Sequence, residues 1–323
     1  METRNTTSRI PFAASSHFWA VLLAGGDGVR LRGLTRRIAG DSRPKQFCRL
    51  VGNTSLFEQT RSRLKPLYSP DRQVFVLSRA HERYYSEDLR ESAAASLVQP
   101  LNRGTGIGII LALIHILERD PHAVVGLFPC DHYYSNEDSF RLTIRAAAAC
   151  AEHRPSSIIL VGAEAEYAEV EYGWIEPDAV VLQTGVGPLF QVHRFWEKPP
   201  LDHARGLMRR GCLWNTFVAF GLAATLLDIL CARVPEAVIS VAKAMADLAW
   251  ETAYPLLETV DFSRDVLAHE TRRLLVLRDR KSGWADLGSP DRVFETLARH
   301  AIRPEWFSEA DKGLFEQLAL HRV

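Results

Sequence analysis

The 323-residue sequence lacks a metal-type cysteine pattern, an excess of either charge, and any long apolar run. Its five cysteines are odd in number and none lies in a CxxC pair, which favours reduced cytosolic thiols over a disulfide framework or a zinc site. Lysine plus arginine and aspartate plus glutamate both number 39, so no overall field attracts nucleic acid or an anionic membrane. No apolar run approaches the length of a membrane span. We therefore expect a cytoplasmic protein that acts on small molecules, with no nucleic-acid or membrane partner.

Internal repeats and a hexapeptide periodicity are also missing, which argues against a solenoid or β-helix. Apolar residues make up 47% of the chain, enough for the core of one large α/β domain with or without a small appendage. Residues 1–17 are polar and lack an apolar signal-peptide segment, so we expect a disordered leader. A nucleotide-binding domain is expected over residues 18–300. Residues 301–323 predict a C-terminal helical tail that packs on the domain or forms a homodimer contact.

Short apolar runs alternate with longer segments of helical periodicity. Beyond a first strand at Phe18–Leu23, we expect strands at Val74–Ser78, Ala123–Phe128, Ser157–Gly162, Phe190–Phe195, Thr216–Gly221 and Arg273–Leu277. Helices are expected at Ser55–Lys65, Ile107–Arg119, Ser139–Glu152, Leu222–Arg233, Pro235–Ala249 and Asp291–His300. The alternation predicts an α/β class with a mostly parallel, mixed sheet flanked by helices. Aromatics and prolines between Glu171 and Pro200 predict a small β-rich insertion over the cleft.

A glycine cluster follows the first strand, in the order Ala24-Gly25-Gly26-Asp27-Gly28. Glycines at a strand end expose backbone N–H groups that form a concave site for phosphate oxygens. Arg30 and Lys45, the latter held by Pro44, would add positive charge. A tight turn also needs glycine, so this cluster alone is weak evidence, and its order is not that of a dinucleotide fingerprint. We interpret it as a site for a nucleotide triphosphate.

Two aspartates follow apolar runs, Asp131 in Pro129-Cys130-Asp131-His132 and Asp286 in Trp284-Ala285-Asp286. Each could be a helix cap or turn residue. Together they are also suited to Mg²⁺, which takes one or two carboxylates plus phosphate oxygens. His132 is a weaker candidate, at most a neighbour of the reacting groups.

A carboxylate and an ammonium group lie side by side in Glu197-Lys198, ahead of two prolines. Such a pair can bind sugar hydroxyls and a phosphate, or it can be a surface ion pair near a turn. Gly173, between two aromatic residues, and Asn215, after a tryptophan, add a backbone donor and an amide suited to a hydroxylated ring. Core aromatics are the simpler explanation of the surrounding residues.

Six segments together resemble the sugar-1-phosphate nucleotidyltransferase family in order and spacing. They are LAGGDGVRL with RPKQF, PCDH, YGWIEP, FWEKP, WNTF and GWADLGS. The Pro-Lys-Gln-Phe form is similar to the mannose-1-phosphate guanylyltransferase (GDP-mannose pyrophosphorylase) branch. Two weaker matches are Ser263-x-Asp265 with Glu270, and Gln99-Pro100-x-x-Arg103-Gly104-Thr105. The resemblance covers Ala20 to about His300.

The resemblance implies a Rossmann-like nucleotidyltransferase fold and a reaction of an NTP with a sugar 1-phosphate that yields an NDP-sugar and pyrophosphate. It implies catalytic roles for Arg30, Lys45 and Asp131. It implies that the nucleotide contacts Gly25, Gly26, Asp27, Gly28, Gln99, Gly104 and Thr105. The sugar would contact Gly173, Glu197 and Asn215, and its phosphate would contact Lys198. Mg²⁺ would be the cofactor, bound by Asp131 and Asp286.

This mechanism needs no protein nucleophile, because a sugar phosphate can itself attack the α-phosphorus. Catalysis is then positioning and neutralisation of charge, in agreement with a chain that offers glycines, cations and two aspartates. GTP and mannose 1-phosphate are the favoured substrates. Arg103-Gly104-Thr105-Gly106 departs from the family's base-contacting loop, however, so another NTP or sugar 1-phosphate stays open. The third alternative is a catalytically silent relative that binds a nucleotide sugar and regulates a partner.

Overall fold

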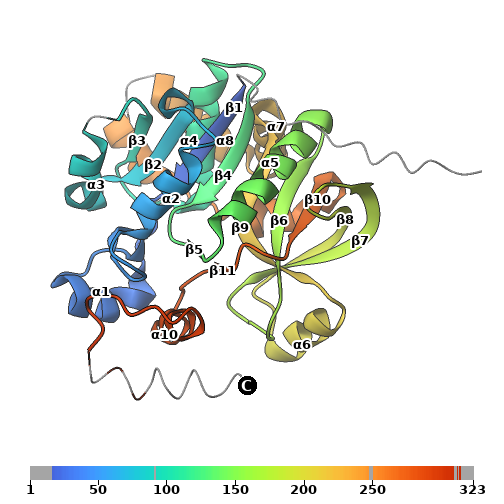
Figure 1. The fold of residues 1–323 in the computed structure, drawn as a ribbon. Coiled ribbons are helices and arrows are strands. Elements are labelled where there is room, and N and C mark those ends of the chain that lie inside the picture. The colour runs from blue at the N-terminus through green and yellow to red at the C-terminus, as the bar shows by residue number, and fades with distance from the viewer. Residues whose placement is uncertain (1–16, 91, 247–249, 309–310, 312, 314–323) are drawn as a thin grey trace, which may run out of the picture.

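The computed structural model describes residues 17–90, 92–246, 250–308, 311 and 313 (Figure 1). Its strands are β1 Phe18–Leu23, β2 Gln73–Ser78, β3 Ala95–Gln99, β4 Val124–Pro129, β5 Tyr133–Tyr134, β6 Ile158–Glu164, β7 Gly173–Gln183, β8 Pro188–Glu197, β9 Leu213–Leu222, β10 Leu274–Asp279 and β11 Trp284–Ala285. Its α-helices are α1 Arg32–Ala39, α2 Leu56–Leu64, α3 Glu82–Leu89, α4 Gly104–Leu117, α5 Glu137–His153, α6 Leu201–Arg209, α7 Ala223–Arg233, α8 Pro235–Ala246, α9 Trp250–Ala253 and α10 Pro290–Arg299. Every strand and helix expected within residues 18–300 is present, with boundaries that differ by a few residues. The last three residues of the helix expected at Pro235–Ala249 lie outside the described residues.

Nine strands form one sheet in the order β3-β2-β1-β4-β9-β6-β10-β8-β7. β3, β2, β1 and β4 are mutually parallel, and so are β6 and β10. β9 runs antiparallel to β4 and β6, and β8 runs antiparallel to β10 and β7. All strands of this sheet except β8 and β9 therefore point the same way. The expected mixed, mostly parallel sheet flanked by helices is confirmed.

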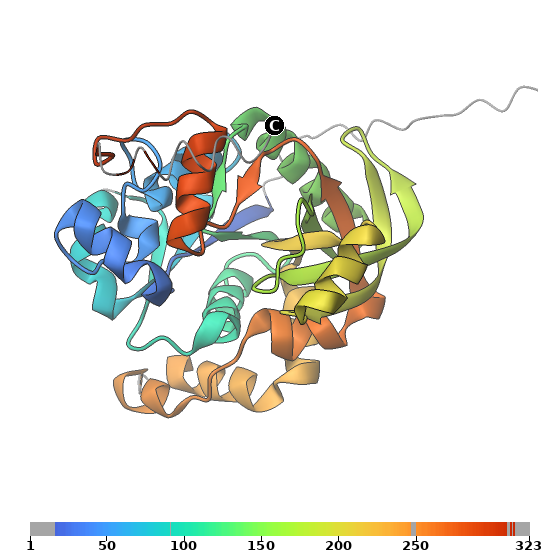
Figure 2. The same ribbon diagram turned by 90° about the horizontal axis from the view of Figure 1, so that it is seen from below.

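β1 is buried on both faces, as a central parallel strand requires. Phe18, Ala20 and Leu22 face a core shared with α2 and α5, while Trp19 and Val21 face a second core shared with α4, α7 and α8. The alternation follows from the two-residue repeat of a strand. Figures 1 and 2 show the two helical layers on opposite sides of the sheet. This double burial fixes the strand ends that carry the glycine cluster and Asp131.

The β-rich stretch forms the hairpin β7–β8, which joins the main sheet through the pairing of β8 with β10 and through the pairing of β7 with β9. It therefore extends the sheet, and its residues Glu171 to Gly173 reach the cleft. A third, smaller core containing Leu31, Leu34, Val293 and Leu297 joins α1 to α10. The short two-stranded ribbon β5–β11 pairs the segment that follows β4 with the segment that precedes α10.

The expected leader, apart from His17, lies outside the described residues, as do residues 314–323 of the expected helical tail. Residues 309, 310 and 312 of this tail are also outside the described residues. Residues 301–308 form turns and coil, so the helix expected over residues 301–323 is wrong for this part. Proline at position 304 fits the coil, since it lacks an N–H for a helical hydrogen bond. Across the described residues no helix combines the length and apolar character needed to cross a membrane.

Candidate functional site

The glycine cluster and Asp131 lie at the same edge of the sheet, because β1 and β4 are parallel and end together. Leu23, the last residue of β1, is in register with Pro129, the last residue of β4. The backbone N–H of Cys130 donates to the Leu23 carbonyl at 3.0 Å, which fixes the start of both loops. Ligands of parallel sheets bind beyond this edge.

Gly28 and Lys45 depend on each other. Gly28 has a φ of +57°, and a Cβ at this position would lie 2.9 Å from the backbone nitrogen of Lys45. Only glycine allows both the left-handed backbone and this close approach. Pro44 directs the chain into the 3₁₀ turn Lys45–Phe47, and Lys45 is buried. The Lys45 Nζ lies 3.2 Å from Asp131 Oδ2 and also donates to the backbone carbonyl of Asp286.

A cavity of about 310 Å³ opens beside the glycine loop. It is lined by Leu23, Gly25, Gly26, Gln46, Val76, Gln99, Asn102, Gly104, Thr105, Gly108, Pro129, Asp131, His132, Phe217 and Asp261. Five of the seven predicted nucleotide contacts are among them. The Gln46 side chain donates to the carbonyls of Ala24 and Gly26, at 3.0 and 2.7 Å, which holds the glycine loop in place. This cavity is the candidate nucleotide pocket.

The other two predicted nucleotide contacts, Asp27 and Gly28, lie outside this cavity lining. Gly28 lines a neighbouring space with Arg30, Lys45 and Asp131. Asp27 Oδ2 accepts from the Asn102 side chain at 3.0 Å, and its Oδ1 lies 3.2 Å from His81 Nε2. Asp27 thus ties the glycine loop to the loop after β3.

The first turn of α4 is packed against residues 259–262, which explains the two glycines in it. Gly104 has a φ of +82°, and a Cβ there would lie 2.3 Å from the carbonyl oxygen of Val260. A Cβ at Gly106 would lie 2.4 Å from the Val260 side chain. The hydroxyl of Thr105 accepts from the backbone N–H of Phe262 at 3.0 Å. Gly104 and Gly106 are therefore needed for the close backbone contact that forms this wall of the nucleotide pocket.

Gly173, Glu197 and Asn215 come together from β7, β8 and β9. Gly173 is in register with Glu197, and a Cβ at Gly173 would lie 3.0 Å from Glu197 Oε2 and 3.3 Å from Asn215 Cβ. The three residues line a second cavity of about 130 Å³ with His132, Tyr172, Phe217, Ser263, Trp284 and Asp286 among others. Burial and the nearby charge of Asp261 raise the pKa of Glu197 to about 6. This cavity is the candidate sugar pocket.

Asp131 and His132 lie where the two pockets meet. His132 and Phe217 line both cavities, and Asp131 lines the nucleotide pocket. Burial works to raise the pKa of Asp131, but the Lys45 and His132 charges outweigh it and lower that pKa. Burial lowers the pKa of His132 in spite of Asp131. The Trp284 indole donates to His132 Nδ1 at 3.1 Å, so the neutral ring carries its proton on Nε2, on the side of Asp131.

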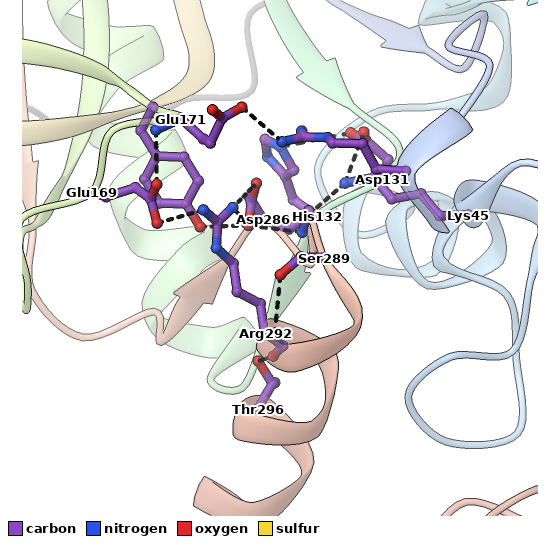
Figure 3. Close-up of polar contacts among 12 residues, drawn as sticks. Lys45, Asp131, His132, Glu169, Glu171, Asp286, Ser289, Arg292 and Thr296 are labelled. Atoms are coloured by element: carbon purple, nitrogen blue, oxygen red, sulfur yellow. Dashed lines mark hydrogen bonds and ion pairs between the residues drawn. The ribbon is translucent and has the colours of Figure 1, made fainter. Parts of the chain in front are cut away.

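Asp286 reaches the site through the ribbon β5–β11. Ala285 pairs with Tyr133, which brings the residue after β11 next to the residue before β5. The Asp286 carboxylate accepts from the Tyr172 hydroxyl and from the backbone N–H of Gly288 at 2.9 Å. It also accepts from the Arg292 guanidinium at 3.0 and 3.1 Å (Figure 3). Burial, together with the Asp286 charge, raises the pKa of Tyr172 far above its ordinary value, so its hydroxyl is a donor at neutral pH.

Arg30 and Lys198 border the site without lining the candidate nucleotide pocket or the candidate sugar pocket. Arg30 forms an ion pair with Glu171 at 3.1 Å across the cleft, and both side chains are about half exposed. Lys198 is exposed and lies 4.0 Å from Glu197. Its φ of +48° is uncommon for a residue with a side chain, and its N–H donates to the Tyr172 carbonyl at 3.2 Å.

One carboxylate suits a divalent cation better than the other. Asp131 lines the nucleotide pocket, its side chain is 36% exposed, and the side chains close to it are Lys45 and His132. The Asp286 side chain is 11% exposed and already has three partners. Among the described residues there is no group of three or more His, Cys, Asp or Glu side chains placed to hold a metal. Asp131 thus fits a metal shared with phosphate oxygens, while the carboxylate of Asp286 is engaged within the protein.

Sequence reasoning missed several residues of the site. Phe217 lines both pockets in a left-handed conformation with a φ of +63°, held by a hydrogen bond from its N–H to Asn215 Oδ1 at 3.1 Å. Asp261 and Gln46 line the nucleotide pocket, and Arg292 contacts Asp286. Gln46 could have been found from its place beside Lys45. The others follow from contacts between distant segments, for which the sequence carries no local signal.

Comparison with known proteins agrees with this architecture. The family model for nucleotidyl transferases matches residues 19–301, which is most of the chain. The chain belongs to the nucleotidyl transferase family.

Named relatives carry the comparison further. The chain is 28% identical over 302 residues to a mannose-1-phosphate guanylyltransferase of Escherichia coli, covering 89% of this chain and 61% of that protein. It is 27% identical to a putative mannose-1-phosphate guanylyltransferase of Vibrio cholerae (88% and 61% covered) and 28% identical to the xanthan biosynthesis protein XanB of Xanthomonas campestris (83% and 57%). The chain thus spans about three fifths of the length of these relatives.

Solved structures have the same fold. A Thermus thermophilus protein described as a mannose-1-phosphate geranyltransferase superposes with a TM-score of 0.75 at 25% identity, covering 88% of this chain and 78% of that one. A Helicobacter pylori protein described as a mannose-6-phosphate isomerase superposes with a TM-score of 0.66 at 20% identity, covering 84% and 100%. The second likeness concerns the fold alone.

Proposed function

We propose that this protein transfers a nucleotidyl group from an NTP to a sugar 1-phosphate, and that GTP and mannose 1-phosphate are its substrates. The observation that carries the proposal is the junction of two pockets at Asp131 and His132, with Lys45 Nζ at 3.2 Å from Asp131. The names of the relatives support the choice of GTP and mannose 1-phosphate. The nucleotidyltransferase domain is proposed to span residues 18–300, and the cytoplasm is its proposed location.

In the proposed reaction a phosphate oxygen of the sugar phosphate attacks the α-phosphorus in line. The new bond joins this oxygen to the α-phosphorus, and the bond to the oxygen that bridges the α- and β-phosphates breaks. Pyrophosphate leaves with the electron pair, and no proton transfer from the protein is needed. The N–H groups of Gly25 and Gly26 would hold the triphosphate, and Lys45 would stabilise charge on the departing pyrophosphate.

The sugar side would be positioned by the second pocket. Glu197 and Asn215 would contact sugar hydroxyls, the absence of a side chain at Gly173 makes room for the ring, and Lys198 would contact the phosphate. Arg30 would turn from Glu171 to the triphosphate once that ligand is bound, because the phosphate charge exceeds that of one carboxylate. Asp27, Gly28, Gln99, Gly104 and Thr105 would contact or shape the nucleotide.

Mg²⁺ is the proposed cofactor, and Asp131 is the residue best placed to hold it. When bound with phosphate oxygens, such an ion neutralises negative charge and orients the triphosphate. The predicted homodimer stays part of the proposal for residues 301–323.

The test is to incubate the purified chain with Mg²⁺, each NTP in turn and a panel of sugar 1-phosphates, and to measure pyrophosphate. We expect release with GTP and mannose 1-phosphate. Release only with UTP or dTTP would refute the choice of base, and release only with another sugar 1-phosphate would refute the choice of sugar. No release with any pair would refute catalysis and leave the silent nucleotide-sugar-binding relative.

A further inference from the structure

Arg292 binds the carboxylate of Asp286 from the first turn of α10. Ser289 caps this helix by accepting from the Arg292 backbone N–H, and Pro290 begins it. The Arg292 side chain extends from there to Asp286, with one guanidinium nitrogen 3.1 and 3.0 Å from the two carboxylate oxygens (Figure 3). The contact joins α10 to Asp286, which lines the sugar pocket.

The same guanidinium has two further partners. Another of its nitrogens contacts Glu169, and the group lies 4.5 Å from the centroid of the Tyr172 ring. The Tyr172 hydroxyl in turn donates to Asp286. Arg292, Glu169 and Asp286 are all largely buried, with side-chain exposures of 14, 8 and 11%. An arginine in such a site is always charged. Breaking a buried ion pair with this geometry is costly in free energy, because it leaves an uncompensated buried charge.

Asp131 differs from Asp286 in its exposure and in how its oxygens are engaged. Its side chain is more exposed, it lines the nucleotide pocket, and its buried partner Lys45 lies close to one of its two oxygens, Oδ2, whereas Arg292 contacts both oxygens of Asp286. A divalent cation bound to phosphate oxygens can displace one ammonium group at Asp131. At Asp286 it would compete with a fixed guanidinium for the same oxygens.

We propose that Arg292 is the counter-ion of Asp286 and a positioning residue of the site, so that Asp131 is the principal carboxylate ligand of the divalent cation. This inference rests on the proposed function, which supplies the need for the cation. It revises the expectation that both aspartates serve equally as metal ligands.

The positioning role of Arg292 follows from the backbone contacts of Tyr172 beside the sugar pocket. Its carbonyl accepts from the Lys198 N–H at 3.2 Å, in the left-handed turn that follows Glu197, and Tyr172 directly precedes Gly173. Arg292 therefore acts on the sugar pocket through Asp286 and Tyr172, without itself lining that pocket.

The experiment measures binding of Mn²⁺ alone to the full chain, without nucleotide or sugar, from the electron paramagnetic resonance signal of the free ion. We expect Asp131→Asn to abolish the binding and Asp286→Asn to change its affinity less than about threefold. Arg292→Leu should tighten binding by about tenfold or more, because an opposite charge within a few ångströms no longer competes for the carboxylate. Asp286→Asn added to Arg292→Leu should remove this gain.

The matched control is Arg299→Leu on the same helix. Arg299 forms a more exposed ion pair with Glu166, and neither residue lines the nucleotide pocket. This variant should bind Mn²⁺ like the parent chain. Arg292→Lys should keep the parent affinity, since it retains a positive charge, although without the planar guanidinium.

Three results would overturn the inference. The first is a loss of Mn²⁺ affinity in Asp286→Asn that is as large as the loss in Asp131→Asn. The second is an unchanged or weaker Mn²⁺ affinity in folded Arg292→Leu. The third is that the parent chain shows no Mn²⁺ binding that depends on Asp131. If Arg292→Leu does not fold, Asp286→Asn still decides, because an asparagine can keep the hydrogen bonds from Tyr172 and Gly288. Pyrophosphate release is assayed separately, so a chain with this metal pattern and no turnover would refute the proposed function alone.

Discussion

Glu197 makes the proposed sugar pocket sensitive to pH in the range where the enzyme would act. Its side chain is 21% exposed, and burial with the charge of Asp261 raises its pKa from 4.5 to about 6, against the opposing charges of Lys198 and Arg264. With that pKa, about nine tenths of the carboxyl groups are ionised at pH 7 and about one tenth at pH 5. An ionised carboxylate accepts hydrogen bonds from sugar hydroxyls with both oxygens.

We therefore expect the KM for the sugar 1-phosphate to rise about tenfold between pH 7 and pH 5, as the ionised fraction of Glu197 falls. The assay is pyrophosphate release at saturating NTP, with sugar phosphate varied at each pH. The phosphate of the substrate also titrates near pH 6, so the comparison is with Glu197→Gln, which removes only the protein's contribution. The ratio of the variant's KM to that of the parent chain should fall toward low pH. A ratio that is constant across this range would refute the reasoning.

Protein stability offers an independent check on the same group. Because the pKa is higher in the folded chain, the folded state holds this proton more tightly than the unfolded one. The carboxyl therefore lowers stability above pH 6, and the penalty disappears as the pH falls through 6 to 4.5. A rise from 4.5 to about 6 corresponds to a penalty of about 2 kcal/mol at neutral pH. Glu197→Gln should raise the unfolding temperature at pH 7, and urea unfolding should show the gain shrinking at pH 5.

Two further predictions concern the glycine loop. Gly28→Ala should displace Lys45 and lower turnover by about tenfold or more, because its Cβ would lie 2.9 Å from the Lys45 nitrogen in a left-handed backbone. Thermal unfolding should show a loss of stability absent from Gly26→Ala, whose Cβ meets nothing within 4 Å. Glu171→Ala should free Arg30 for the triphosphate and so lower the KM for the NTP in steady-state kinetics. The free energy of unfolding should change by less than about 1 kcal/mol, because the ion pair is exposed. A higher KM in this variant would show that Glu171 assists nucleotide binding.

The elements foreseen from the sequence are those with a strong hydrophobic period. β4 and α5 are buried along a whole strand or helical face, and their patterns are correspondingly clear. α1 and α6 are short and present few apolar side chains, and β3 is a half-exposed edge strand, so none gave such a signal. β9 begins three residues earlier than expected because a bulge opposite Leu160 and Gly162 interrupts its alternation.

The candidate site divides in the same way. Residues in compact motifs, such as Gly25, Lys45 and Asp131, were predicted and do lie around the pockets. Arg292 was not predicted, because its contact with Asp286 depends on the pairing of β5 with β11 and on where α10 begins. Such contacts arise from tertiary packing, and an isolated arginine in a helix gives no sign of them.

The strand β9 runs antiparallel to β4, β6 and β7, and it lies between the strands of the two pockets. The glycine loop, Gln99 and the start of α4 belong to one side, and the β7–β8 hairpin belongs to the other. Under the proposed function each substrate has largely its own set of strands, while His132 after β4 and Phe217 of β9 line both pockets. Under the proposed function, changes in the hairpin, which carries Gly173 and Glu197, can alter the sugar pocket while the glycine loop of the nucleotide pocket is kept. A chimaera that exchanges this hairpin between two relatives would transfer the choice of sugar without transferring the choice of base.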